Sequence, residues 1–211
     1  LFLSYRNPVG SSQSQSGVDE QSGDPGAYME YRVHGVLIPG WLWLTSNHLW
    51  IKVSADGHIH AGIDDFFARA LGSVDQIDYI TAKGNVRPVV VITVAGIDLQ
   101  VVFPVSFSIT GTNTYLRTNL RKLTSDPYSL GWLFEGLEPQ PAMRQFGEEK
   151  RKGVLKSGAD AARWMADEIR RFSASVHESA ARSVHGDIGE VMADGGVFCQ
   201  GVFHLLRREE I

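Results

Sequence analysis

The sequence has little cysteine, no excess of positive charge and no long apolar run. Its 211 residues include one cysteine, Cys199, which excludes an internal disulfide framework and a metal site built from several cysteines. The formal net charge is −4, so an extended nucleic-acid surface is not expected. The longest apolar stretches, residues 36–44 and 89–95, are far shorter than the roughly 20 residues that cross a bilayer.

What is present indicates a folded chain behind an N-terminal tether. The hydrophobic share is 43%, near the globular norm, and 22 glycines with 8 prolines favour a strand-and-turn fold. Residues 1–6, an apolar stub followed by Tyr5 and Arg6, are typical of the end of a membrane helix. A trimmed terminus or a cleaved precursor is the alternative. Residues 7–27, rich in Ser, Gln and Gly, predict a flexible linker.

Residues 28–137 predict a mainly β domain with an aromatic lead-in segment at residues 28–46. Short β-rich runs separated by turn signals indicate a small barrel or sandwich. The clearest predicted strands are residues 49–53, 58–63, 89–94 and 99–103. Asp64 and Asp65 precede an apolar run that stops at Gly72, which predicts a short helix with an acidic start and a glycine end. The spacing in residues 114–123 predicts a further helix.

Residues 138–211 predict a helical C-terminal extension. Its best helix covers residues 157–184, where Trp164, Met165, Ile169 and Phe172 fall on one apolar stripe. Mainly β with added helices is therefore the expected fold class.

Residues 48–134 resemble the H protein of the glycine cleavage system, a lipoyl-carrier fold of the barrel-sandwich hybrid type. The matching motifs occur in the family's order and at similar spacing. They are His48–Ile51, Gly62–Gly72, Pro104–Ser106, Asn113 and Asp126–Leu133. The resemblance implies a barrel-sandwich hybrid domain.

The lysine that carries the lipoyl group in that family has no counterpart here. In the family it lies at a hairpin tip, eight residues before the proline of Pro-Val-Ser, and that count from Pro104 reaches Gly96. No lysine occurs between Lys83 and Lys122. Because lipoyl attachment needs a primary amine, we expect no lipoyl arm and no cofactor.

The extension resembles that of a bacterial group of H-protein-like sequences. Members carry an N-terminal membrane segment, an H-like domain without the lysine, and a helical tail. The tail motifs correspond to Ala162–Trp164 and Ala193–Gly196. This resemblance implies a membrane-tethered architecture and no particular activity.

Three histidines suggest a metal site as an alternative. His58 and His60 fall on one face of a predicted strand, and His48 is expected on the neighbouring strand. With Asp64 or Asp65 nearby they could bind Zn²⁺. Exposed or structural histidines are the simpler interpretation, because a hairpin face lacks the surrounding groups that support a metal site.

Other reactive residues have plainer explanations. Asp64 and Asp65 could form an acid–base pair, but acidic residues at a helix start usually cap free N–H groups. Cys199 could be a nucleophile, but its apolar neighbours favour a buried structural thiol. Trp41 and Trp43, outside the resembling block, are the best candidates for contact with a partner protein or a membrane interface.

These observations predict a non-catalytic accessory or scaffolding subunit of a larger complex, with other protein subunits as partners and no nucleic acid. We expect it to be membrane-associated, with its soluble domain in the cytoplasm. The first alternative is an acyl or lipoyl carrier protein in glycine cleavage or sulfur metabolism. The second is a His-based metal-binding protein centred on His48, His58 and His60.

Overall fold

The computed structural model describes residues 29–54, 56–137 and 153–183, with side chains up to residue 174. The expectations for residues 1–6, residues 7–27 and Cys199 therefore lie outside the described residues.

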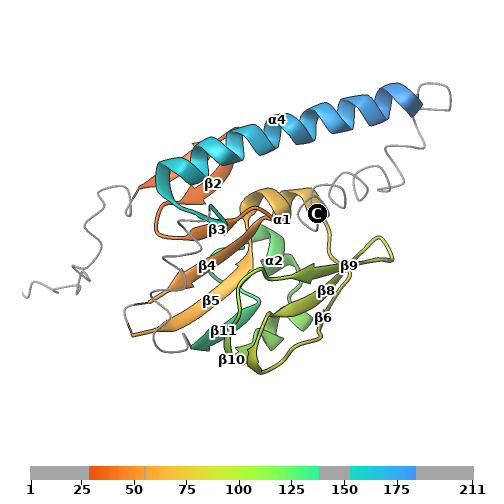
Figure 1. Cartoon of the computed structure of the whole chain (residues 1–211). Helices are drawn as coiled ribbons and strands as arrows, with labels where there is room; N and C mark the ends of the chain where they lie inside the picture. Colours follow the sequence, from red (N-terminus) through yellow and green to blue (C-terminus); the bar gives the residue numbers. More distant parts are fainter. Residues whose placement is uncertain (1–28, 55, 138–152, 184–211) are drawn as a thin grey trace, which may run out of the picture.

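Antiparallel strands dominate the described part of the chain (Figure 1). The strands are β1 (Glu30–Val33), β2 (Val36–Pro39), β3 (Trp43–Thr45), β4 (Leu49–Val53), β5 (His58–Ile63), β6 (Gln76–Tyr79), β7 (Gly84–Val86), β8 (Val89–Val94), β9 (Ile97–Val102), β10 (Phe107–Thr112), β11 (Phe134–Leu137) and β12 (Leu155–Lys156). The helices are α1 (Asp65–Leu71), the 3₁₀ helix η2 (Thr114–Arg117), α2 (Arg121–Ser125) and α4 (Gly158–Ser183).

Two sheets enclose the main core. One has the strand order β12-β3-β4-β5-β11-β10-β7 and the other the order β6-β8-β9. Alternate residues of β8 are buried, as expected for a strand with one face on the core. Side chains of both sheets, including Ile51, Ile59, Ile92 and Leu99, belong to one buried cluster. The expected class, a mainly β barrel-sandwich hybrid with added helices, is confirmed.

The motif around Gly62 is explained by a close approach between neighbouring strands. Gly62 pairs with Trp50, and a Cβ on Gly62 would lie 2.8 Å from Nε1 of the Trp50 ring. The same Nε1 donates to the carbonyl of Pro127 at 3.1 Å. A glycine at this position therefore leaves room for a buried indole that ties β4 to the segment after α2.

The helix expected over residues 114–123 is two short helices, η2 and α2. The break falls at Thr118 and Asn119, where the N–H groups bond to carbonyls three residues earlier. The Asn119 side chain also donates to the Tyr115 carbonyl at 3.3 Å. Such local side-chain bonds compete with a continuous helix.

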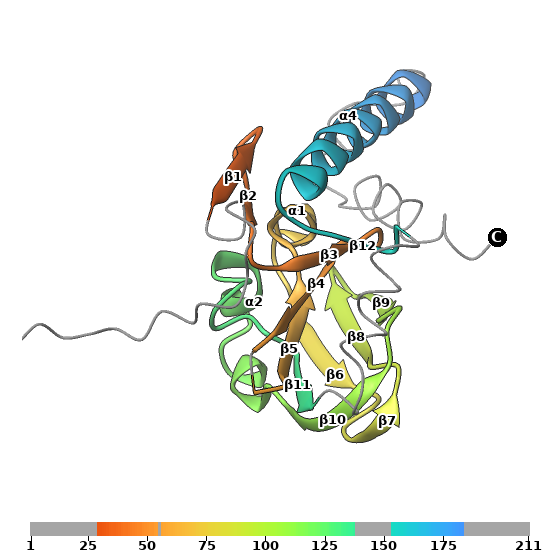
Figure 2. The ribbon, with the colours of Figure 1, turned by 60° about the vertical axis from the view of Figure 1, so that its left-hand side comes forward.

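The helix expected over residues 157–184 is confirmed as α4, which lies against the β1–β2 hairpin and α1 (Figure 2). Its Ala161 and Met165 are buried in a second core cluster with Ile38, Leu42 and Leu44. Before α4, β12 pairs with β3 and extends the large sheet. The extension thus supplies part of the domain that it follows.

Candidate functional site

The β8–β9 hairpin brings the carrier position of the resembling family to an exposed tip. Val94 pairs with Ile97, which leaves Ala95 and Gly96 as a two-residue turn. Both have left-handed backbones, with φ of 51° at Ala95 and 72° at Gly96. Such φ values are typical of the tightest hairpin turns. A side chain at Gly96 would meet no atom within 4 Å, so the position is open and lacks any reactive group.

Polar groups around this tip are engaged with one another. The N–H of Gly96 donates to the Asp75 carboxylate at 3.3 Å, and the Thr93 hydroxyl donates to the Asp98 carboxylate at 2.7 Å. Ile97 beside them is 45% exposed. We define the hairpin tip as Ala95 and Gly96 with Asp75 and Asp98. The hairpin tip, as defined, therefore presents a two-residue turn without a large side chain, flanked by two carboxylates and lacking a nucleophile.

Asp64 caps α1, as expected for an acidic helix start. One of its carboxylate oxygens accepts the N–H of Phe67 at 2.8 Å. The other lies 3.0 Å from Nδ1 of His48, and both side chains are almost fully buried. Since the carboxylate has two structural partners in the core, it is a fixed anchor.

His48 is enclosed between two helices. Its ring centroid lies 4.7 Å from that of Phe66 on α1 and 5.1 Å from that of Trp164 on α4. Its backbone is left-handed, with φ of 62°. Nε2 of His48 is buried with no hydrogen-bond partner among the described residues. His48 therefore links α4 to the start of α1.

Asp65 and Tyr128 tie the same helix start to the N-terminal hairpin. The Asp65 carboxylate accepts the N–H of Leu37 at 2.7 Å and pairs with Nε of Arg69 at 2.9 Å. The Tyr128 hydroxyl accepts the N–H of Asp65 at 2.9 Å and donates to the carbonyl of Leu37 at 2.8 Å. Burial raises the pKa of Tyr128 well above its usual range, and the nearby Asp64 charge adds to this.

We define the α1 corner as His48, Asp64, Asp65 and Tyr128. Sequence reasoning missed the role of Tyr128, although Tyr128 falls in the Asp126–Leu133 motif. The acid–base alternative for Asp64 and Asp65 has no support here, because both carboxylates are occupied by backbone and side-chain donors.

The metal-site alternative, in which His48 would join His58 and His60, is not supported by the structure. The β4–β5 register sets Leu49 beside Ile63 and Lys52 beside His60, so His48 and the other two histidines lie toward opposite ends of the strand pair. In the part of the chain described, no three His, Cys, Asp or Glu side chains are grouped to hold a metal ion. His60 instead packs edge-on against Trp132, with ring centroids 5.4 Å apart. Burial lowers the pKa of His60.

The two candidate contact tryptophans differ in position. Trp41 follows β2 and is 42% exposed. Trp43 begins β3, is half-buried and packs against the main core. Trp41 is therefore the more available of the two for a partner.

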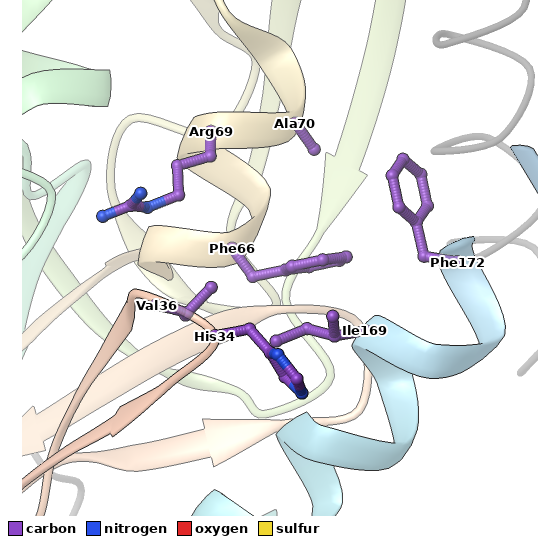
Figure 3. A pocket seen from close by; sticks show the side chains of 7 residues that line it. All are labelled: His34, Val36, Phe66, Arg69, Ala70, Ile169 and Phe172. Atoms are coloured by element: carbon purple, nitrogen blue, oxygen red, sulfur yellow. The ribbon is translucent and has the colours of Figure 1, made fainter.

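A cavity of about 220 Å³ opens between the β1–β2 turn, α1 and α4 (Figure 3). We call it the α1–α4 groove, and its lining residues are His34, Val36, Phe66, Arg69, Ala70, Ile169 and Phe172. Phe66 extends from α1 toward Ile169 and Phe172 of α4, and the guanidinium of Arg69 points away from them. The groove is thus apolar inside and polar at its edge.

None of the helices among the described residues is both long enough and apolar enough to span a bilayer. The tether expected at residues 1–6 lies outside that part of the chain.

Similar proteins share the name suggested by the motifs. A glycine cleavage system H protein from Mycobacterium avium is 36% identical over 103 residues, covering 46% of this chain and 76% of that protein. H protein 2 of Pseudomonas syringae is 33% identical over 103 residues, covering 46% and 78%. The H protein of Halorhodospira halophila is 30% identical over 108 residues, covering 50% and 81%.

Among solved structures, a glycine cleavage system H protein from Mycobacterium marinum aligns with a TM-score of 0.40 and 22% identity, covering 54% of this chain and 99% of that one. No family model matches the chain. Family membership rests on the sequence relatives, because the match spans about three quarters of the M. avium protein at 36% identity. The chain therefore belongs to the glycine cleavage system H protein family.

Proposed function

We propose that this chain is a non-catalytic, H-protein-like accessory or scaffolding subunit that carries no lipoyl group. The hairpin tip is the observation on which the proposal rests. Ala95 and Gly96 stand where the family resemblance places the carrier lysine, and neither offers an amine. The α1 corner, in contrast, is held by buried hydrogen bonds of Asp64 and Tyr128, none of which involves a lipoyl group, which supports a domain that folds without one.

Intact-mass measurement of the chain from its native host tests this proposal. The expected mass is that of the unmodified polypeptide, with a lysine-bearing H protein from the same cells as the positive control. A lipoyl or other acyl mass on the chain would contradict the proposal.

The carrier alternative rests on family membership itself, together with Lys83, which is exposed in the turn before β7. Under this alternative the added mass would map to a peptide containing Lys83, and Lys83→Arg would abolish it. The matched control is Lys52→Arg, an exposed strand lysine. The mass of the native chain therefore distinguishes the accessory-subunit proposal from the carrier alternative.

We propose further that the chain acts in a membrane-associated assembly on the cytoplasmic side, with residues 1–6 as the end of a tether. Residues 7–27 would be the linker, residues 28–137 the H-like domain and residues 138–211 the extension. Trp41 supports a protein contact, since a half-exposed indole is a common anchor of interfaces.

Fractionation and co-purification of the untruncated native protein test the assembly. We expect it in the membrane fraction with stoichiometric partner subunits. Trp41→Ser should release those partners, whereas Trp43→Ser should mainly lower stability, because Trp43 packs on the core. Recovery of the native protein alone, and only in the soluble fraction, would contradict the proposed membrane-associated assembly.

A further inference from the structure

The α1–α4 groove is an apolar surface that the described residues leave uncovered. Its floor is formed by Val36, Phe66 and Ile169, from three different elements. Its volume of about 220 Å³ is below the 300–1,000 Å³ typical of small-molecule sites. The groove therefore has the size of a receptor for one or two protruding side chains of a peptide segment.

The charge at its edge does not call for an anionic ligand. Nε of Arg69 is paired with Asp65, and the guanidinium points away from the floor (Figure 3). His34 lies in the β1–β2 turn at the opposite edge. An apolar occupant fits this arrangement better than a phosphate or a free carboxylate.

The chain itself contains a suitable occupant. Residues 197–206 read Val-Phe-Cys-Gln-Gly-Val-Phe-His-Leu-Leu, with six large apolar side chains. The segment lies beyond the described residues and follows α4, the helix that forms one wall of the groove. So apolar a segment is unfavourable in water unless something covers it.

The connection between the helix and this segment is long enough. From Phe172 to the end of α4 at Ser183 the helix advances about 16 Å, at 1.5 Å per residue. Residues 184–196 number 13 and can span at most roughly 43–47 Å. The segment can therefore return to the groove on the same molecule, and four glycines at positions 186, 189, 195 and 196 favour a reversal.

We propose that residues 197–206 bind in cis in the α1–α4 groove, inserting apolar side chains against Phe66 and Ile169. The apolar side chains of the segment are then removed from water against the apolar lining of the groove. This proposal is independent of the hairpin tip and of lipoyl attachment.

The single cysteine makes the proposal testable by disulfide trapping in the full chain. Cys199 lies inside the segment, so His34→Cys and Arg69→Cys place a second thiol at either edge of the groove. Lys83→Cys is the matched control, because Lys83 is exposed and directly precedes β7 (Gly84–Val86). Strand β7 lies at the far end of the domain from α4 (Figure 2). Each variant is oxidised mildly at low protein concentration, and the products are identified by peptide mass.

We expect His34→Cys and Arg69→Cys to form the intramolecular disulfide with Cys199 at least tenfold faster than Lys83→Cys. Equal rates at all three positions would overturn the proposal. Disulfides between two differently tagged chains, in place of internal ones, would also overturn it and identify a second copy as the occupant. Because His34 has a left-handed backbone, Arg69→Cys keeps the test valid if His34→Cys does not fold.

Discussion

The α1 corner and the hairpin tip are opposite kinds of surroundings within one domain. At the α1 corner, His48 and Asp64 are buried against each other, and Tyr128 bonds to two backbone groups. At the hairpin tip the side chains face solvent, and Gly96 has no neighbour within 4 Å of where a side chain would begin. We therefore expect substitutions in the corner to cost stability through lost contacts, and substitutions at the tip to cost stability only where they oppose its left-handed backbone.

This difference separates two uses of a carrier-like domain. The corner joins α1, the N-terminal hairpin and α4 into one unit, and none of its groups depends on a lipoyl arm. A domain of this kind can therefore lack the attachment point and keep its architecture. Substitutions in each region test how far the two regions are independent.

Asp64→Ala is expected to have the largest effect. It removes the cap of α1 and leaves the buried Nδ1 of His48 without its acceptor, so we expect a loss of about 2–4 kcal/mol in the free energy of unfolding. Urea denaturation measures it. The control Asp98→Ala, at the hairpin tip, should change stability by less than about 0.5 kcal/mol. Equal losses of unfolding free energy in the two variants would contradict the proposed difference between the α1 corner and the hairpin tip.

Tyr128→Phe is expected to cost about 1–3 kcal/mol, because it leaves the N–H of Asp65 and the carbonyl of Leu37 without a partner. It should also change the response to alkali. Burial raises the folded-state pKa of Tyr128, so as pH rises above about 10 the unfolded wild type ionises first and is favoured. The variant lacks this contribution, and its stability should fall less steeply from about pH 9 to 11. Parallel pH profiles would contradict this account.

Two glycine substitutions compare the hairpin tip with the packed β4–β5 strand pair that leads into the α1 corner. Gly62→Ala forces a methyl group against the Trp50 ring, so we expect a loss of about 1–3 kcal/mol. Gly96→Ala meets no atom but must hold φ at 72°, which costs about 1–2 kcal/mol. Thermal unfolding with near-UV circular dichroism distinguishes them. Only Gly62→Ala should alter the tryptophan signal, and a changed signal in Gly96→Ala would mean that the tip is coupled to the core.

The smallest predicted effect concerns His60, which lies outside both regions. Burial lowers its folded-state pKa, opposed by Glu135 and aided by Lys52 and His58. As pH falls below the ordinary value of 6.5, the unfolded chain takes up the proton more readily, and stability declines. His60→Asn should lose less stability than wild type between about pH 7.5 and 5.5. An unchanged acid response would assign the sensitivity to other groups.

Local signals made much of the fold predictable. Strand β4, strand β5 and helix α1 follow from alternation, a turn at Asp56 and Gly57, and a capped start with a glycine stop. Strands β1 to β3 were anticipated only as an aromatic lead-in, because their pairing depends on partners elsewhere. For example, β3 pairs with β12, more than 100 residues away.

The site divides in the same way. The family resemblance implied, by a count back from Pro104, that Gly96 would stand at a hairpin tip, and the β8–β9 register confirms a two-residue turn there. The burial of His48 was not predicted, because Trp164 covers it from an extension outside the resembling block. Tyr128 bonds to Asp65 and Leu37, which precede it by 63 and 91 positions in the sequence. A single sequence gives no signal for contacts between such distant positions.

The pairing of β12 with β3 sets the smallest piece of this chain that can stand alone. Leu155 and Lys156 cover the backbone edge of β3, and Leu155 is buried in the main core. A polypeptide ending at residue 137 would keep every motif of the H-protein family and still expose an unpaired strand, a frequent starting point for aggregation. The main sheet and its core therefore extend past the motifs of the family, into residues 155 and 156.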